Sequence, residues 1–427
     1  MFASLFSPGF SPGLVLPRNG PPIAPSKTDT HITVEAALTP DFGEELRVTQ
    51  LVDENTSVAQ GQPLLKLRAA PGIALVAPMA GRVGRIDLHP GHKLSQLVLF
   101  HEANGDRHQY KTRSPASGAT ELRTLLQACG LWRAFRSRPF GRMPKADETP
   151  AAIFVMGVDS QPDAPAPLTS IAAREDEFCR GMDALAKLTT AECFFCEPMR
   201  RSFSGRIPAS FTRLQTGTTH PQGLAGLLIH HHFPARMDAP VWDIHAEDIA
   251  DLGALLATGY LPETRFVTIT GDALRKPALV RCQPGADLRG LSQNLVKPGP
   301  HSIQTGSMLD GRPAHWLGHR DRQVTVLERT PATHTRHWFV AALERAARHA
   351  PIIPTAALNQ ALGGAMPVAA LVRSLATGDT ETFNDLGGLS LVEEDLALAD
   401  YATGARPRLA SQLRTMLTRI AAEEDAL

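Results

Sequence analysis

The sequence has few of the residues that build disulfide frameworks and metal clusters. It contains five cysteines among 427 residues. One pair forms a C-x-x-C motif, but a single pair cannot complete a four-thiolate zinc or iron–sulfur site. We therefore interpret that pair as apolar residues of a buried strand, rather than as a redox pair or half of a metal site, and we predict no disulfide framework. The cysteines are Cys129, Cys179, Cys193, Cys196 and Cys282.

The sequence also has no net charge. Lys and Arg number 43, and so do Asp and Glu, so the formal net charge at pH 7 is zero. Nucleic-acid binding leaves a basic footprint, so we expect no nucleic-acid partner. No apolar run approaches the roughly 18 residues of a transmembrane helix. The opening stretch, which Pro and Gly interrupt, makes a poor signal peptide. We expect a cytoplasmic chain that meets a membrane only through other proteins.

Glycine is missing where a cofactor site would need it. The apolar run Ala151–Val158 is followed by Asp159-Ser-Gln-Pro162, which predicts a buried strand that ends in a turn. In an open parallel sheet, ligands bind just beyond the carboxyl ends of the strands. A phosphate site there requires glycines for close backbone approach, and this loop carries prolines instead. We interpret Asp159 and Pro162 as parts of a degenerate cofactor loop.

A basic and aromatic segment, Gly130–Pro144, precedes this strand. It reads GLWRAFRSRPFGRMP, and no acidic residue appears until Asp147. We predict a loop that follows an amphipathic helix over Glu121–Cys129, with Gly130 as the glycine that ends the helix. The candidate functional residues of the segment are Trp132, Phe135, Arg136, Arg138, Pro139, Phe140 and Arg142.

The remaining patterns predict an α/β multidomain protein. Short strands with Gly and Pro turns indicate a β unit, and the strand–helix–strand order after it indicates a parallel α/β unit. Strands around one short helix then suggest a β-grasp unit, before the chain becomes helical. The predicted parts are an irregular lead-in at 1–28, a barrel-sandwich domain at 29–112, a Rossmann-like domain at 113–262, a β-grasp (SLBB-like) domain at 263–329, and a helical domain without iron–sulfur cysteines at 330–427.

Two further features of the α/β part are predicted. The residues Leu168–Leu188 have the apolar spacing of one helix. The three histidines His230-His231-His232 follow an apolar run and are interpreted as a polar strand end. On a strand, at most the first and third could share an ion, and no carboxylate or thiolate lies beside them. We therefore predict no metal site there.

The barrel-sandwich assignment depends on a resemblance. The spacing of Val52, Val58 and Gly61, followed by Ala-Pro at 77–78 and Gly81-Arg-Val83, resembles biotinyl and lipoyl carrier domains. Carrier domains present a modifiable lysine on a hairpin between the two halves. The corresponding hairpin here has no lysine, so we expect the fold without the carrier chemistry.

Collinear stretches give the chain a second and wider resemblance. The basic-aromatic segment, together with TPAAIFV (149–155), resembles the A subunit of the sodium-translocating NADH:quinone reductase. That family is similar in fold to the flavoprotein subunit of complex I and to the C subunit of the Rnf complex. The other matching stretches are Thr219–Gly226, Val241–Ile244, Lys276–Arg281, Gly285–Leu288, Ala376–Asp379 and Val392–Leu398.

The resemblance implies a role within a larger enzyme. It implies a cytoplasmic-side peripheral subunit at the bacterial inner membrane, not catalytic in isolation, that docks on the membrane-embedded B subunit and contributes to ubiquinone access or binding. It also implies no tightly bound cofactor. Phe135 and Phe140 could then stack on the quinone, and Arg136 or Arg138 could donate to a quinone carbonyl. Two simpler interpretations remain open. The arginines could pair with acids while the aromatic rings fill a domain interface, or the segment could anchor a partner.

An alternative function is a soluble electron-transfer adaptor of the Rnf or complex I type that still binds a nucleotide or flavin. The glycine-free loop at Asp159 and the absence of cysteine from 330–427 favour the first function. Closer family members often carry cysteines at Ala399–Gly404, where this sequence has none. A free-standing enzyme finds no support, because no nucleophile triad or paired-carboxylate motif stands out.

Overall fold

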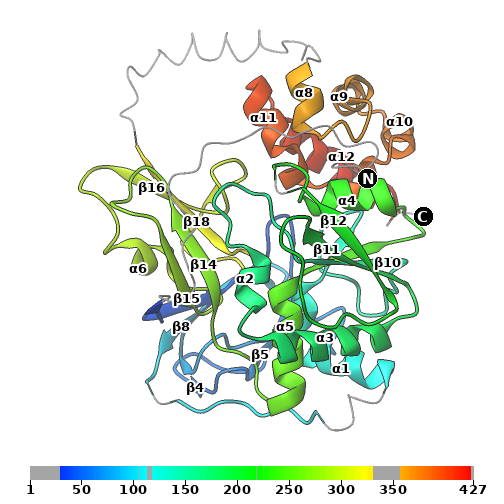
Figure 1. Ribbon diagram of the computed structural model, residues 1–427. Coiled ribbons are helices and arrows are strands. Elements are labelled where there is room, and N and C mark those ends of the chain that lie inside the picture. The colour runs from blue at the N-terminus through cyan, green and yellow to red at the C-terminus, as the bar shows by residue number, and fades with distance from the viewer. Residues whose placement is uncertain (1–28, 104, 113–117, 218, 330–355, 425–427) are drawn as a thin grey trace.

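The computed structural model describes residues 29–103, 105–112, 118–217, 219–329 and 356–424. The predicted lead-in at 1–28 and the stretch 330–355 lie outside the described residues. Figure 1 shows most of the strands on one side, an α/β unit on the other, and the C-terminal helices together at the top. The predicted α/β class with several sheets and a helical C-terminal region is confirmed. Within the described ranges, no helix has the length and apolar character needed to span a membrane.

Residues 35–101 form two small antiparallel sheets that share one core. Val48, Leu65 and Leu97 are among the side chains that are fully buried in it. Alternation along each strand brings the apolar residues to the inner face. The first sheet contains β2 (Glu35–Leu38), β8 (Lys93–His101), β7 (Gly81–His89) and β4 (Ser57–Val58); the second contains β3 (Val48–Gln50), β5 (Pro63–Leu67) and β6 (Ala74–Val76).

A five-stranded sheet forms the frame of the α/β unit. Four strands are parallel and β9 is antiparallel. The chain winds outward from β10 to β12, then returns to place β13 on the other side of β10. Such a reversal is a topological switch point, where open α/β sheets bind their ligands. The order is β12 (Phe211–Thr216), β11 (Glu192–Pro198), β10 (Ala152–Met156), β13 (Val241–His245) and β9 (Arg136–Arg138).

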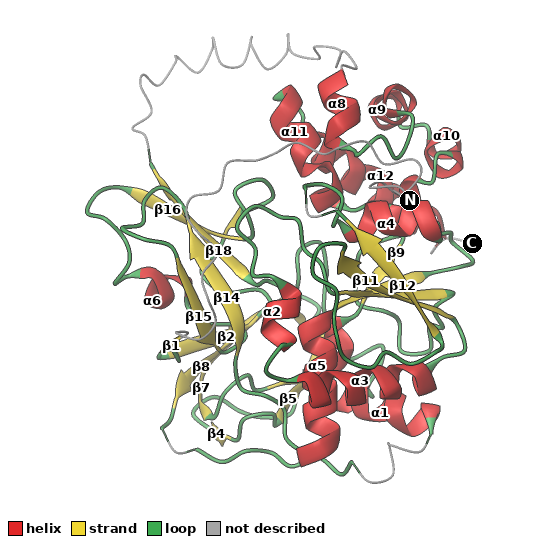
Figure 2. Ribbon diagram, in the orientation of Figure 1, coloured by secondary structure: helices red, strands yellow, loops and turns green. Residues whose placement is uncertain are grey.

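Helices cover both faces of this sheet (Figure 2). The helices α1 (Ala119–Ala128), α3 (Glu175–Leu188) and α5 (Ala246–Thr258) share a core with Ile153 and Val155 of β10. Phe154, which points to the opposite face, packs with the fourth helix, α4 (Ala225–His232). A strand buried on both faces needs a continuous apolar sequence, which explains the run in β10.

Two sequence predictions about this unit are wrong. The three histidines end α4 and do not lie on a strand, because a short apolar run does not distinguish a helix from a strand. The predicted helix over 168–188 is two helices, α2 (Pro167–Ile171) and α3. Arg174 leaves helical geometry at φ −131°. Three acidic residues follow it, and acids in a first turn stabilise a new helix N-terminus.

A six-stranded sheet lies beside the α/β unit. The predicted strands Arg265–Thr270 and Ala278–Cys282 are confirmed as β14 and β15. The short helix α6 (Leu288–Ser292) begins at Asp287, whose carboxylate accepts from the backbone N–H groups of Arg289 and Gly290. The strand order is β1 (Asp29–Thr30), β15, β14, β18 (Gln323–Glu328), β16 (His301–Thr305) and β17 (Arg312–Pro313).

The C-terminal helices pack around a separate apolar core. Leu371, Phe383 and Leu413 are fully buried in it, and Leu227 of α4 joins the same core. This contact fixes the helical region on the α/β unit. The helices are α8 (Ala356–Ala361), α9 (Val368–Thr377), α10 (Thr380–Asp385), α11 (Ala397–Thr403) and α12 (Leu409–Glu424), with 3-10 turns at Gly388–Ser390 and Glu393–Leu396.

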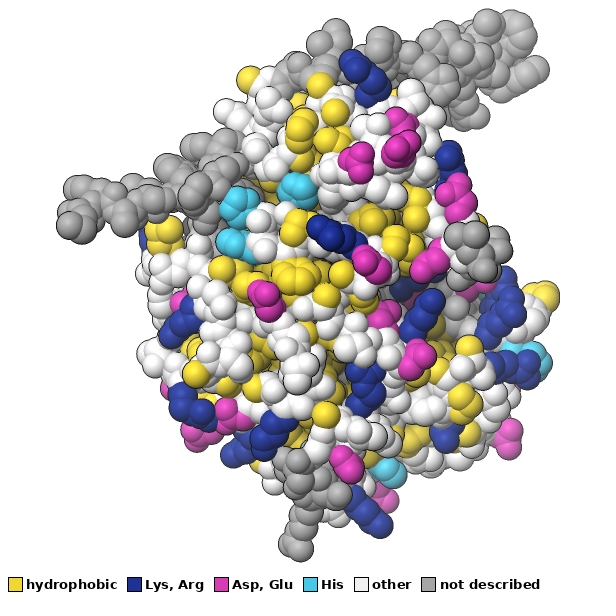
Figure 3. Space-filling view, turned by 90° about the vertical axis from the view of Figure 1, so that its right-hand side faces the viewer, with side chains coloured by type: hydrophobic (Ala, Val, Ile, Leu, Met, Phe, Trp, Pro, Cys, Tyr) yellow, Lys and Arg dark blue, Asp and Glu magenta, His cyan; other side chains and the backbone are white. Residues whose placement is uncertain are grey.

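Figure 3 shows the face of the molecule that lies to the right in Figure 1. Positively and negatively charged side chains are interspersed over this face, and hydrophobic side chains gather between them. The equal numbers of acidic and basic residues are therefore not separated into large areas of one sign on this face.

The contact between α3 and α5 generates a prediction about stability. A Cβ at Gly253 would overlap the carbonyl oxygen of Glu177 on α3. We predict that Gly253→Ala lowers the free energy of unfolding by about 1–3 kcal/mol, because overpacking outweighs the gain in helix propensity. Urea unfolding followed by circular dichroism measures the change. The control is Ala257→Leu, at an exposed position of the same helix, which should change stability by less than about 0.5 kcal/mol. Equal stability of Gly253→Ala and the wild type would contradict this packing.

Candidate functional site

The basic-aromatic segment is not the loop that the sequence predicts. Leu131–Ala134 form a 3-10 turn, and Arg136–Arg138 form β9, the strand beside β13. The glycine before the turn is correctly predicted: Gly130 has φ 81°, a left-handed conformation that suits the residue after a helix. The segment was misjudged because β9 pairs with a strand more than a hundred residues away.

The aromatic residues of the segment fill the interior. Trp132 and Phe135 are each 0% exposed. Their ring centroids lie 5.3 Å from that of Trp242 on β13. The indole N–H of Trp132 donates to the carbonyl oxygen of Pro144 at 2.9 Å. Phe140 packs against the C-terminal helical core, and the guanidinium of Arg142 lies 5.5 Å from its ring centroid. These rings join parts of the protein and do not form an open stacking surface.

The arginines of the segment pair with acids from two distant parts of the chain. Arg136 bonds to Asp243 of β13 at 3.1 Å and to Glu394 at 2.6 Å. Arg138 is 0% exposed and lies 3.2 Å from Asp243 and 3.8 Å from Asp395. We name these five residues the ion cluster. It connects the sheet of the α/β unit to the 3-10 turn that precedes α11.

The two neighbouring carboxyls of the ion cluster have opposite pKa shifts. Burial alone would raise the pKa of Glu394, but the charges of Arg136 and Arg138 and the hydrogen bond from Arg136 lower it to about 2. Burial raises the pKa of Asp395 to about 7, with a further increase from Glu394, although Arg138 acts in the opposite direction. The difference arises because Arg136 bonds directly to Glu394, whereas Arg138 only approaches Asp395.

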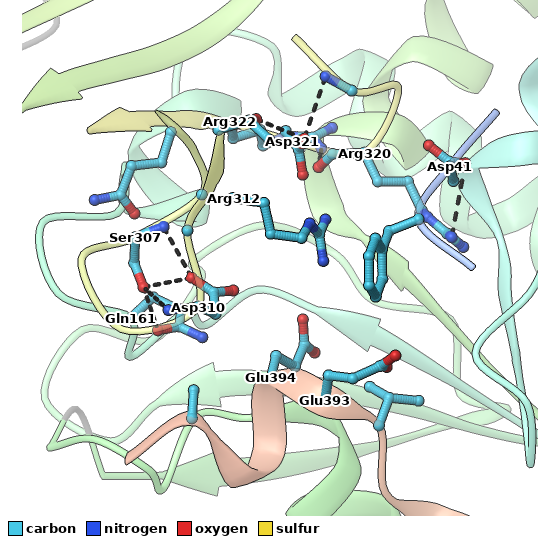
Figure 4. A pocket seen from close by; sticks show the side chains of 18 of the residues that line it. Asp41, Gln161, Ser307, Asp310, Arg312, Arg320, Asp321, Arg322, Glu393 and Glu394 are labelled. Carbon is cyan, nitrogen blue, oxygen red and sulfur yellow. Dashed lines mark hydrogen bonds and ion pairs between the residues drawn. The ribbon is translucent and has the colours of Figure 1, made fainter. Parts of the chain in front are cut away.

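A cavity of about 750 Å³ opens at the topological switch point (Figure 4). Met156 and Val158 after β10, and His245 at the end of β13, line it from the α/β unit. The other walls come from the six-stranded sheet and the C-terminal helices. Of the sequence-predicted residues, Arg136 and Asp159 line the cavity. The others are not among its lining residues: Trp132, Phe135, Arg138, Pro139, Phe140, Arg142 and Pro162.

The loop after β10 is anchored by its backbone. The carboxylate of Asp159 accepts from the backbone N–H of Gln161 at 2.8 Å. Asp159 lines the cavity and is exposed there. The protein atoms that surround its carboxyl, and then the nearby carboxylates of Glu394 and Asp310, raise the pKa of Asp159 to about 6. The carbonyl oxygen of Pro162 accepts from Gln323 at 2.7 Å. The loop thus joins the α/β unit to β18.

Arg312 of β17 reaches into the cavity from the six-stranded sheet (Figure 4). Its guanidinium lies 4.2 Å from the ring centroid of Phe42, which is 53% exposed. Within the described part of the chain, Arg312 forms no ion pair. By contrast, Arg320 pairs with Asp41 at 3.6 Å, and Arg322 pairs with Asp248 at 2.7 Å. Arg312 therefore has guanidinium N–H donors available to a ligand.

The charge of the cavity wall restricts what can bind. Nine of the lining residues are Asp or Glu, six are Arg, and none is Lys. At least four of the six arginines are paired: Arg136, Arg320, Arg322 and Arg414. Excess negative charge disfavours a phosphate group, because like charges repel most strongly away from water. The wall is compatible with a neutral ligand that accepts hydrogen bonds.

Sequence reasoning missed Phe42, Arg312 and His245. The first two lie in parts of the chain without a motif, far from β10 in sequence. His245 had a weak signal, since it follows the apolar Val241–Ile244 stretch and directly precedes a helix. Asp159 was identified by the same signal, because it directly follows a predicted strand.

Comparisons with known proteins find relatives along nearly the whole chain. A family model described as the NqrA second alpha/beta domain matches residues 118–261. The A subunit of the Na(+)-translocating NADH-quinone reductase of Pasteurella multocida is 31% identical, covering 96% of this chain and 98% of that protein. The same-named subunit of Pseudomonas aeruginosa (strain UCBPP-PA14) is 30% identical, covering 96% of this chain and 98% of that protein. The same-named subunit of Rhodopirellula baltica is 28% identical, covering 96% of this chain and 97% of that protein. An air-oxidized NAD+-reducing [NiFe]-hydrogenase aligns at a TM-score of 0.39 and 14% identity over 72% of this chain and 65% of its own, a likeness too low to bear on the fold.

The raised pKa of Asp395 generates a prediction about pH. Because this pKa is higher in the folded chain than in the unfolded chain, the group contributes less stability as pH rises from about 4 to about 7. Asp395→Asn cannot ionise but keeps an oxygen for the backbone N–H of Val392, which donates to the Asp395 carboxyl at 2.8 Å. We predict that the stability of the variant relative to the wild type increases by roughly 1–3 kcal/mol between pH 5 and pH 8. Urea unfolding at both pH values measures it, and a constant or decreasing difference would contradict the assignment.

Proposed function

Because this chain belongs to the NqrA family, that of the A subunit of the Na(+)-translocating NADH-quinone reductase, we propose that it is a peripheral subunit of a sodium-pumping NADH:ubiquinone reductase. In this proposal it lies on the cytoplasmic face of the bacterial inner membrane and docks on the membrane-embedded B subunit. It carries no tightly bound redox cofactor and holds ubiquinone in the cavity at the switch point. The location and the docking derive from the family relationship, whereas the quinone role also has support in the cavity.

The observation that carries the quinone role is the pair formed by Arg312 and Phe42. A cavity of about 750 Å³ is within the ~300–1,000 Å³ range of small-molecule sites. A quinone headgroup is flat and neutral, and each of its carbonyl oxygens accepts a hydrogen bond. The ring of Phe42 provides an apolar surface, and the guanidinium of Arg312 provides donors beside it. A charged donor also stabilises negative charge that develops on a carbonyl oxygen during reduction.

The charge balance favours this role over binding of a nucleotide or flavin. A nucleotide would bring phosphates to a wall with more carboxylates than guanidiniums. The loop that would approach the phosphates contains no glycine between Val158 and Pro167. Open α/β sheets that bind dinucleotides use glycines at this place.

The basic-aromatic segment has an indirect part in this proposal. Arg136 lines the cavity, but its guanidinium is occupied by Asp243 and Glu394. The segment therefore forms a wall and connects the surrounding units. Its contribution to quinone binding is to hold the cavity open between the sheet and the C-terminal helices.

Titration of the purified chain with a short-chain ubiquinone tests the proposal. We predict saturable binding that Arg312→Gln weakens by at least about tenfold, because a charge-assisted hydrogen bond contributes about 1.5–3 kcal/mol. Phe42→Ala should also weaken binding. The matched control is Arg85→Gln on β7, whose side chain is 61% exposed and pairs with Asp87, and it should bind as the wild type does.

The same samples distinguish the alternative function. The visible spectrum should show no flavin. A yellow protein that binds flavin or NADH in preference to quinone would support the electron-transfer adaptor. Absence of quinone binding, or binding that neither cavity variant affects, would contradict a quinone site in this cavity.

A further inference from the structure

His245 lies at the topological switch point, where β10 and β13 are neighbours. His245 is the last residue of β13 and lines the cavity. Parallel pairing places it beside Met156, the last residue of β10, which also lines the cavity. β10 and β13 lie next to each other at the switch point, and the carboxyl ends of both strands face the cavity. A ligand that enters the switch point meets this imidazole.

A hydrogen bond at one ring nitrogen fixes the tautomer of His245. The backbone N–H of Glu247 donates to Nδ1 of His245 at 3.1 Å, and this bond caps the N-terminus of α5. A ring nitrogen that accepts a hydrogen bond carries no proton, so the proton of the neutral ring is on Nε2. The cap therefore turns the outer nitrogen of the ring into a donor.

The surroundings keep the ring neutral. Burial, and then the positive charges of Arg322 and Arg265, lower the pKa of His245 well below its ordinary value. Arg322 is fixed there by ion pairs to Glu247 at 3.1 Å and to Asp248 at 2.7 Å. A neutral ring can accept the Glu247 N–H and still donate from Nε2, whereas a doubly protonated ring would lose the cap.

We propose that His245 binds the quinone by donating its Nε2–H to a carbonyl oxygen, an inference that rests on the proposed function above. A quinone has two carbonyl oxygens, and each accepts without donating. Arg312 enters the cavity from the six-stranded sheet (Figure 4) and provides a donor from a second wall. With one donor from β13 and one from β17, the site recognises a neutral molecule with two acceptors. A ligand that presents only donors leaves both groups unsatisfied.

Two substitutions separate the donor from the cap. Asn at position 245 keeps an acceptor near the position of Nδ1 and is a good N-cap residue, but it has no donor as far out as Nε2. Gln at the same position has a longer side chain, which places its amide N–H groups near the position of Nε2. It loses the hydrogen bond from the backbone N–H of Glu247 that caps α5. The measurement is the dissociation constant of the purified full-length chain for a short-chain ubiquinone, together with the thermal midpoint of each variant without ligand.

We predict that His245→Asn keeps the thermal midpoint of the wild type and binds quinone about tenfold more weakly, which corresponds to one hydrogen bond. His245→Gln should bind more tightly than His245→Asn despite a lower midpoint. If His245 acted only by capping α5, His245→Gln would bind quinone more weakly than His245→Asn. Imidazole nitrogen NMR gives a second readout, because the wild type should show the Nε2–H tautomer, with the Nε2 resonance moving when quinone is added.

The outcomes are distinguishable. If the wild type binds quinone and His245→Asn binds it equally well, the role of His245 is overturned while the proposed function stands. If the wild type does not bind quinone, the proposed function fails and the role of His245 fails with it. A proton found on Nδ1 would overturn the donor assignment whatever the affinities are.

Discussion

The ion cluster is the constraint on which the arrangement of this protein depends. Arg136 and Arg138 on β9 face Asp243 on β13 and the carboxylate of Glu394 in the 3-10 turn before α11. Removing one partner of a buried ion pair commonly costs about 3–5 kcal/mol, because the remaining charge is left without compensation. The cluster therefore favours the position of the C-terminal helices in which these charges meet. In that position the helices close one side of the cavity, so the same contacts that join the units also shape the site.

Polar side chains reach the cavity from three parts of the protein, and each part holds its side chains in place in a different way. The end of β13 holds a histidine whose tautomer is set by a backbone hydrogen bond. The six-stranded sheet contributes a guanidinium that stacks on Phe42. The C-terminal helical region contributes carboxylates, and the negative charge of Glu394 is balanced by its ion pair with Arg136. Donors are thus available to a ligand, while much of the acidic charge is already paired. This balance suits a neutral acceptor such as a quinone better than an anion.

The sequence predicted local features well and long-range contacts poorly. The strand after the basic segment, the left-handed Gly130 and the strands Arg265–Thr270 and Ala278–Cys282 follow from local patterns. The position of Asp159 beside a ligand-sized cavity follows from its place after a parallel strand. No local pattern shows that Arg136 pairs with acids 107 and 258 residues away. For the same reason a buried basic-aromatic strand was interpreted as a loop, and Arg312 had no signal at all.

The claim that a quinone occupies the switch-point cavity is tested most directly by photocrosslinking. A short-chain ubiquinone with a photoreactive group would be irradiated with the purified chain, and the labelled peptides would be identified by mass spectrometry. We predict labels on peptides that contain Phe42, Asp159 or Arg312, and that excess unmodified ubiquinone suppresses them. Labels confined to residues that do not line the cavity, under the same competition, would contradict the account.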